Sequence, residues 1–537
     1  MRHTAVAKTR YSPFIPNVTG DIKRTASIPA PVQGWDTKSG LAQMPPNHAV
    51  QMDNWIPRTG WIEIRRGFVP HATDVGTSTD PVESLMMYNT PAGATELFAV
   101  AGDTIYDVTN AGAAVPTSVT GLNNTKWQFT NFTNESDAQN YLVCGNGVDT
   151  AQIYDGSSWA NWSISITGYS AADVIQPHAH QGRLWAVLNN SNEVAYLPLG
   201  AISGTATIFP LGTFMGRGGY VMAMTSWTVD TRQTVSDYAA FITNVGQVIV
   251  FMGTDPESNW SLVGVYDIGP PIGRRCFEKI AGDVAILCVD GLLPMSQVLA
   301  TDRSVQSNVS LTEWIAGAML QATNAYSSNF GWQIISYPKG NLAIINIPQV
   351  ENSTAVQFVM ETNTKGWCRF LGIDANVWAV KEGTENTIFF GGNDSTVYQY
   401  DIGSGDDDMA ISATVQTAFN YHGMRGQLKN WTLIRPIITS DGSILPGVGL
   451  NTDYGTGAFV SLPTAIDSTG ATWDVSLWDV AIWPQEGLTS ADWQTISGTG
   501  QCCSVITTVQ TLANGTANGV LLQLNGWDMA FEAGGLI

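Results

Sequence analysis

Two histidines at alternate positions are the first residues of this sequence whose spacing could support chemistry. His178 and His180 flank a single alanine, so on a β-strand both imidazoles would lie on the same face. Two imidazoles on one face could supply two ligands of a metal site, but a zinc site needs three or four protein ligands. No third ligand is identifiable nearby in the sequence, so we interpret the pair as part of a loop lined by aromatic residues.

The cysteines offer a second possible source of metal ligands. They lack both C-x-x-C spacing and a histidine partner at ligand distance in the sequence, so zinc is not expected. Two of them lie in the apolar runs NYLVCG and VAILCVDG, where a buried thiol packs as a small hydrophobic side chain. So few thiols in a chain of 537 residues fit synthesis in a reducing cytoplasm. The six are Cys144, Cys276, Cys288, Cys368, Cys502 and Cys503.

Carboxylates and catalytic motifs add little. The run Asp406 to Asp408 lacks the spaced Asp/Asn and closing Glu of a calcium loop, so we expect an exposed linker there. The sequence has no G-x-S-x-G, H-E-x-x-H or P-loop motif, and DGSSW at Asp155 matches only half of the box found in sialidase-like propellers. Carboxylates from distant strands could still meet to form a glycosidase site. We predict that the chain is not an enzyme and binds no cofactor or metal.

The charge balance limits the partners that the chain can bind. With 45 acidic and 24 basic residues, the formal net charge is −21, which argues against gripping nucleic acid through its phosphates. This acidity is compatible with DNA sliding past unbound, and equally with a chain that is acidic only for solubility. Charged residues make up only 13% of the sequence, and such a neutral surface suits permanent neighbours.

The first 30 residues differ from the rest in being basic and rich in proline. We expect an extended arm over residues 1–30, either a free terminus or a segment that docks on an acidic neighbouring subunit. No uncharged apolar run approaches the roughly 18 residues needed to cross a bilayer, and no export signal is recognisable. The basic residues of this segment are Arg2, Lys8, Arg10, Lys23 and Arg24.

A repeated pattern in the middle of the chain predicts the fold. An apolar run, a Gly/Asn/Asp turn and a second run ending near Tyr-Asp or Trp recur at about the 40–50-residue period of a four-stranded propeller blade. With 54 glycines and 24 prolines marking turns, we predict an all-β protein with a propeller of six to eight blades over residues 80–405. Two β-sandwiches in series would explain the ending of each repeat less well. The repeats begin near Leu97, Tyr141, Leu184, Val248, Val284, Leu342 and Ile388.

Within each repeat the first run is continuously apolar, as expected of an inner strand with a neighbouring blade on both sides, and the second run alternates like an outer strand. One helix interrupts the pattern at SLTEWIAGAMLQAT, where Ser310 and Glu313 have the spacing of a capping box. After the acidic run, residues 406–537 read as a separate β-rich domain. It includes the alternating segment Trp473 to Trp483 and two strands in SVITTVQTLANGTANGVLLQLNGW, joined at Asn-Gly and Gly-rich turns.

Residues 31–68 resemble the opening of the tail nozzle proteins of short-tailed bacteriophages, also called tail tubular or packaged-DNA stabilisation proteins. In that family a Gly…Thr segment precedes L-x-x-M-P-P, then D-N-W/Y-x-P-x-x-G and E-x-R-x-G-(F/Y). The matching residues here are Gly34, Thr37, Leu41, Met44, Pro45, Pro46, Asp53, Asn54, Trp55, Pro57, Gly60, Glu63, Arg65, Gly67 and Phe68.

This motif predicts a short helix after Pro46, a turn from Pro57 to Gly60 and a strand that carries two isoleucines into a core. A second segment, residues 419–442, is similar to the strand pair with a central I-R-P that follows the propeller in these proteins, here including Arg435 and Pro436. We interpret the motif residues as structural. They are Asp53, Asn54, Trp55, Pro57, Arg65, Gly67, Arg435 and Pro436.

The resemblance implies a platform built from residues 31–79 and 406–537, with the propeller as an outer lobe. It further implies a homohexameric ring in the virion tail, with a central channel for retaining and ejecting double-stranded DNA that passes without specific binding. The expected partners are the adaptor, or head-to-tail connector, and the tail fibres or tailspikes. A propeller lectin or other glycan-binding module is the main alternative, and a polysaccharide-cleaving enzyme is the third.

Overall fold

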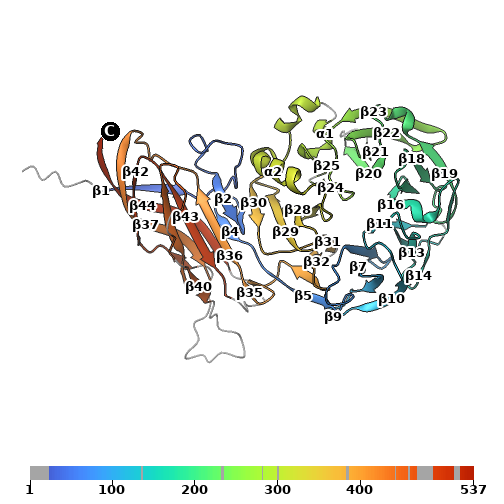
Figure 1. Cartoon of the computed structure of the whole chain (residues 1–537), viewed down its shortest axis with the longest axis horizontal. Helices are drawn as coiled ribbons and strands as arrows, with labels where there is room; N and C mark the ends of the chain where they lie inside the picture. The colour runs from blue at the N-terminus through green and yellow to red at the C-terminus, as the bar shows by residue number, and fades with distance from the viewer. Residues whose placement is uncertain are drawn as a thin grey trace, which may run out of the picture.

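The computed structural model describes residues 23–537 except 135–136, 231–234, 281, 299–300, 382–385, 442, 458–459, 462, 468–487, 513–520 and 537. Two lobes are visible in Figure 1, a ring of small sheets and a pair of long sheets beside it. Nearly all of the regular secondary structure is β-strand, with few and short helices among the described residues, which confirms the predicted all-β class.

The ring is a β-propeller. Among the described residues, seven sets of strands surround a common axis, and the last innermost strand contacts the first. The first three sets are β6 (Ser84–Asn89), β7 (Thr95–Ala101), β8 (Thr104–Asp107) and β10 (Val115–Thr120); β11 (Gln128–Thr133), β12 (Asn140–Gly145), β13 (Gln152–Tyr154) and β14 (Trp159–Asn161); and β16 (Val174–His180), β17 (Arg183–Leu188), β18 (Glu193–Tyr196), β19 (Gly204–Pro210) and β15 (Ile164–Ile166).

The remaining four sets complete the circle. They are β20 (Val221–Asp230), β21 (Val235–Thr243), β22 (Gln247–Asp255) and β23 (Asn259–Asp267); β24 (Phe277–Ile280), β25 (Asp283–Cys288) and β26 (Gly291–Pro294); β27 (Gln333–Tyr337), β28 (Leu342–Val350), β29 (Thr354–Glu361) and β30 (Trp367–Phe370); and β31 (Val377–Lys381), β32 (Thr387–Gly391), β33 (Val397–Tyr400) and β5 (Phe68–Thr73).

Five of these blades are sheets of their own, and the last two continue into larger sheets. The sixth blade extends through β30 into the platform, while the seventh takes its outermost strand, β5, from the N-terminal segment by antiparallel pairing with β33. The ring is therefore closed by a strand that precedes the first blade in the sequence. Five blades are thus separate propeller sheets, and the count reaches seven only with the two blades that continue into the larger sheets.

The apolar repeats occupy a different place in the blade from the one expected. Six of their starts fall in the second strand from the axis and one, near Val248, in the third strand of its blade. The second strand is buried between both neighbouring blades, as Leu97 and Leu184 show, which explains its continuous apolar run. The innermost strands carry a mixture of apolar and polar side chains along the axial channel, such as Met87 and Ile335 beside Gln176 and Thr225.

The platform consists of two β-sheets that pack face to face. Trp527 on one sheet donates an indole hydrogen bond of 2.9 Å to Thr507 on the other, and buried Trp431 lies in the same core. One sheet contains β1 (Lys23–Pro29), β3 (Trp55–Pro57), β4 (Ile62–Ile64), β37 (Gln427–Ser440), β41 (Leu488–Ser490), β42 (Gln494–Gly500) and β44 (Leu522–Leu536). The other contains β2 (Ala49–Asp53), β36 (Ser412–Thr417), β39 (Gly447–Thr452) and β43 (Cys503–Gln510), and it continues into the sixth blade.

Both ends of the chain build this platform, as predicted. β1 pairs with β44 along its whole length, and β2 pairs with β36. Both strands predicted in residues 504–527 are present, but they are not paired: β43 and β44 lie in the two facing sheets. Trp473 to Trp483 and residues 1–22 of the predicted arm lie outside the described residues.

Two local predictions were wrong. The predicted helix does form as α2 (Ala316–Tyr326), but without the capping box, since Ser310 binds the Leu292 carbonyl and Glu313 pairs with Lys38 of the N-terminal segment. A single turn closed by His48 N–H to Pro45 oxygen (3.0 Å) replaces the expected helix after Pro46, because β2 begins immediately afterwards.

The remaining α-helix and strands are short. They are α1 (Met295–Val298); β9 (Gly112–Ala113), β34 (Gly405–Asp406) and β35 (Met409–Ala410), which extend the sheet of the seventh blade around β5; and β38 (Ser443–Leu445) and β40 (Thr464–Asp467), which form a two-stranded sheet of their own. None of the helices in the described part of the chain has the length and apolar character needed to span a membrane.

Candidate functional site

Asn54 lies where the chain passes from one platform sheet to the other, between β2 and β3. Its φ of 59° is left-handed, a conformation that asparagine tolerates better than most residues. The amide donates to the Ser412 carbonyl (2.8 Å), while its oxygen accepts from the Leu371 N–H (2.9 Å) and the Arg65 Nε (2.9 Å). This one side chain joins the N-terminal segment, the end of the sixth blade and the start of the C-terminal domain.

Arg65 is the charged centre of the same junction, and it is 1% exposed. Its guanidinium forms a bidentate pair with Asp406 (2.8 and 2.5 Å) and also donates to the Leu371 carbonyl (2.8 Å). Burial tends to lower the pKa of Arg65, but the attraction and hydrogen bonding of Asp406 more than offset it and leave that pKa above its ordinary value. Arg65 therefore stays positively charged, and its counter-ion, Asp406, comes from the segment that follows the last propeller strand in the sequence.

The pairing corrects the expectation for the acidic run. Asp406 is buried at 8% exposure in β34 instead of lying in an exposed linker, whereas Asp407 and Asp408 are exposed. A buried guanidinium needs a carboxylate partner, and Asp406 is the one that the fold supplies. Sequence spacing could not reveal the pair because 341 positions separate the two residues.

Asp53 connects the platform to the propeller by a second ion pair. Its carboxylate accepts from Arg369 at 2.7 and 2.9 Å, at the point where β2 runs parallel to β30. The Arg369 guanidinium also lies over the Trp35 ring, 5.5 Å from its centroid. Bidentate arginine pairs of this kind fix orientation as well as distance.

The other N-terminal motif residues fill space around this junction. Trp55 is fully buried in the shared core, and Pro57 lies against Gly366. Gly67 passes so close to Gly405 that a Cβ at position 67 would lie 1.8 Å from the Gly405 carbonyl oxygen. The glycine is required by this close backbone approach. The structure therefore brings Asp53, Asn54, Arg65 and Gly67 together around one joint.

Arg435 and Pro436 belong to a different cluster, on the β37–β44 pair. The Arg435 guanidinium binds Asp528 (2.5 and 3.2 Å) and lies over the Trp493 ring. Asp528 also accepts from the Ser27 hydroxyl (2.6 Å), which ties β1 to the same sheet. These bonds lower the pKa of Asp528. The second motif thus holds the two ends of the chain within one sheet.

The axial channel of the propeller is a further candidate site that the sequence did not indicate. It forms a cavity of about 550 Å³ to which the innermost strand of every blade contributes. Met87, Phe129, Thr225, Ile335 and Ala379 are among its lining residues, and they differ in character from blade to blade. The channel therefore presents one composite site and not a repeated one.

The two histidines lie in this region and meet at a serine. His178 Nε2 and His180 Nδ1 lie 2.9 and 2.8 Å from the Ser226 hydroxyl oxygen. Burial lowers the pKa of His178 to about 3 and that of His180 to about 4, so both are neutral at pH 7. Within the described residues no group of three or more His, Cys, Asp or Glu side chains is arranged to hold a metal.

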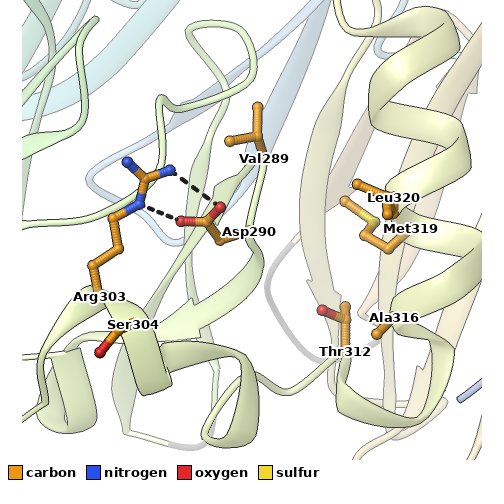
Figure 2. A pocket seen from close by; sticks show the side chains of 8 residues that line it. All are labelled: Val289, Asp290, Arg303, Ser304, Thr312, Ala316, Met319 and Leu320. Carbon is orange, nitrogen blue, oxygen red and sulfur yellow. Dashed lines mark hydrogen bonds and ion pairs between the residues drawn. The ribbon is translucent and has the colours of Figure 1, made fainter.

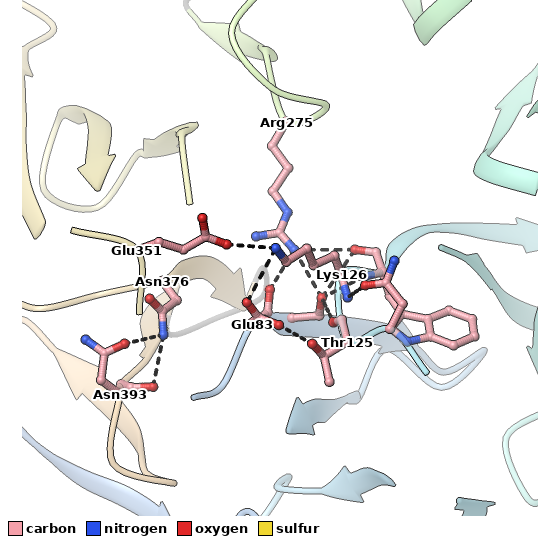
Figure 3. A network of polar contacts seen from close by, with 11 residues as sticks. Glu83, Thr125, Lys126, Arg275, Glu351, Asn376 and Asn393 are labelled. Atoms are coloured by element: carbon pink, nitrogen blue, oxygen red, sulfur yellow. Dashed lines mark hydrogen bonds and ion pairs between the residues drawn. The ribbon is translucent and has the colours of Figure 1, made fainter. Parts of the chain in front are cut away.

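A polar network lies at one mouth of the channel (Figure 3). Arg275, just before β24, reaches the Glu83 carbonyl at 2.8 Å, and the Lys126 ammonium pairs with Glu351 at 2.9 Å. Glu83 also accepts from the Thr125 hydroxyl. The network links the first, second, fifth and sixth blades. Adjacent arginines in a chain with few basic residues are the only signal in the sequence that could have pointed to it.

A second cavity and the cysteines also contain polar or thiol groups. A cavity of about 440 Å³ between α2 and the segment after β25 contains Asp290 and Arg303, which are ion-paired with each other at 2.8 Å (Figure 2). All six cysteines are free and buried, and burial raises the pKa of Cys276 and Cys288 to about 12, so these thiols are protonated and unreactive at pH 7.

No family model and no curated protein matches this sequence. Similar solved structures include BBS1N in complex with ARL6DN, at 10% identity and a TM-score of 0.41, covering 63% of this chain and 98% of that one. YCF48 bound to D1 peptide has 10% identity and a TM-score of 0.36, with 67% and 99% covered. A glycoside hydrolase family 43 arabinoxylan arabinofuranohydrolase from Bacillus subtilis has 11% identity and a TM-score of 0.25, with 90% and 95% covered. Similarities at this level assign no function.

Proposed function

We propose that this chain is the nozzle subunit of a short-tailed phage tail, a structural protein without a catalytic site. In this role six copies form a ring with the platforms around a central channel and the propellers as outer lobes. The ring attaches below the portal and adaptor, anchors fibres or tailspikes, and carries the genome during ejection. The coarser description, a propeller module joined to a β-rich platform, is a property of the fold itself.

The observation that carries the proposal is the joint around Arg65 and Asp406. The residues that resemble the nozzle family are used there to connect three parts of the chain, and their polar atoms are taken up by buried internal bonds. Side chains engaged in this way stabilise a scaffold and are not available to a substrate. A motif devoted to holding a propeller on a platform supports a mechanical role.

The charge of the chain supports the DNA-passage part of the role. Each copy carries a formal charge of −21, so a ring of several copies repels phosphate and leaves DNA mobile. The glycan-binding alternative predicts the same aromatic and polar pocket in each blade. Among the described residues, the lining of the axial channel changes from blade to blade, which does not match that expectation.

The proposal is tested by the assembly state of the full-length chain. We expect mass photometry and negative-stain electron microscopy, over a range of protein concentrations, to show a hexameric ring with a central opening. A ring closed by head-to-tail contacts has one interface type, so intermediates should share that interface. A chain that stays monomeric at every concentration and binds polysaccharide on a glycan array would contradict the proposal and support the lectin.

A further inference from the structure

One mouth of the axial channel gathers three cations, Lys126, Arg274 and Arg275, which together with the Phe330 ring we call the basic mouth. They line a cavity of about 360 Å³, and both arginines also line the channel itself. Figure 3 shows Arg275 and Lys126 pointing toward each other from different blades. Their gathering is unusual in a chain with a formal charge of −21.

Arg275 is held in place through one of its two terminal guanidinium nitrogens, while the other has no hydrogen-bond partner in the described part of the chain. Its Nη2 donates to the Glu83 carbonyl (2.8 Å) and the Ser84 hydroxyl (3.1 Å), and the guanidinium lies over the Phe330 ring, 5.1 Å from its centroid. In the described part of the chain, Nη1 is buried and has no hydrogen-bond partner. Burial lowers the pKa of Arg275 to about 10, with the attraction of Glu83 opposing it, so the group stays charged at pH 7. A buried charged donor without a partner is costly unless a ligand supplies an acceptor.

Arg274 is the second cation without a carboxylate partner among the described ion pairs. Its Nη1 donates to the Asn146 carbonyl at 3.1 Å, and burial lowers its pKa, opposed by Tyr220. Lys126 pairs with Glu351 at 2.9 Å and Glu83 at 3.8 Å, and Glu83 also attracts Arg275. Because three cations face these two carboxylates, the basic mouth keeps an excess of one positive charge.

We propose that the basic mouth binds a single oxyanion, a carboxylate or phosphate group, between Arg274 and Arg275. Guanidinium groups present paired N–H donors that match the oxygens of such groups, and Nη1 of Arg275 is the donor awaiting an acceptor. The acidity of the whole chain opposes a polyanion such as DNA. The oxyanion then belongs either to a small free anion or to an acidic side chain of a partner peptide. This site does not depend on the nozzle role.

The test is isothermal titration calorimetry of the full-length chain with two probes, inorganic phosphate and a capped peptide with one glutamate. We expect Arg274→Gln to raise the dissociation constant roughly 10- to 100-fold, as for the loss of one charge-assisted hydrogen bond. Arg303→Gln is the matched control, because it removes an exposed arginine at another cavity and should leave binding unchanged. Circular dichroism melting confirms that both variants fold.

The two probes distinguish the sources of the oxyanion. Tighter binding of phosphate supports a free anion, and tighter binding of the peptide supports an acidic side chain of a partner. Either result, lost in Arg274→Gln and kept in Arg303→Gln, supports the site. Absence of binding of both probes at about ten millimolar, or equal loss in both variants, overturns it.

Discussion

Replacing Asp406 by asparagine should weaken the joint between propeller and platform. The substitution keeps the size of the side chain but removes the negative charge that faces Arg65, whose side chain is 0% exposed while that of Asp406 is 10% exposed. At an effective dielectric constant of about 20, two unit charges 4 Å apart attract by about 4 kcal/mol. Leaving one charge of a buried pair without its partner costs about 3–5 kcal/mol. We expect the free energy of unfolding to fall by about that amount.

The measurement is denaturant unfolding at pH 7, followed by tryptophan fluorescence and far-UV circular dichroism, with calorimetry to test whether the two lobes unfold together. Asp290→Asn is the matched control. It removes the same charge from an arginine pair whose side chains are 40% and 28% exposed, and such exposed pairs contribute about 0–1 kcal/mol. The double variant Arg65→Met with Asp406→Asn should lose less stability than the sum of the two single variants, because they share one interaction.

A loss of less than about 1 kcal/mol for Asp406→Asn, equal to that of the exposed control, would refute the reasoning. It would mean that water or another group replaces the carboxylate at Arg65. Additive losses in the double variant would refute it independently, since the two residues would then not act as a pair.

Three further substitutions test other contacts. Gly67→Ala should lower stability by at least about 2 kcal/mol, because its Cβ would meet the Gly405 carbonyl, whereas Gly40→Ala, with nothing within 4 Å, should be neutral in thermal melting. The pKa of His180 is about 6.5 in the unfolded chain and about 4 in the folded one, so the free energy of unfolding falls as the pH drops between these values. We therefore expect His180→Asn to reduce the slope of unfolding free energy against pH by about 1.4 kcal/mol per pH unit in that range. An unchanged slope would contradict this. Lys429→Met should lose roughly 2–4 kcal/mol in denaturant unfolding, since its buried ammonium donates to three carbonyls, and a loss under 1 kcal/mol contradicts this.

Local pattern was enough to predict the class of fold. Apolar runs and turn residues are set by neighbours in the sequence, so the repeats starting near Leu97, Leu184 and Leu342 marked one strand in each of their blades. Their position within the blade was misjudged, because burial on both faces looks the same for the innermost strand and the one behind it. The capping box at Ser310 failed for a related reason, since a distant partner took the Glu313 side chain.

Contacts between residues distant in the sequence depend on the closed fold. Local pattern predicted a β-propeller between two flanking segments, and the N-terminal motif marked Asp53, Asn54 and Arg65 as structural. It could not supply the partner of Arg65, which is 341 positions away, or show that β5 closes the seventh blade. The basic mouth could not be predicted either, since Lys126 comes from a different blade than the adjacent Arg274 and Arg275. Such contacts arise because a closed ring brings segments from both ends of the chain together, and a local sequence pattern cannot predict contacts between residues so far apart in the sequence.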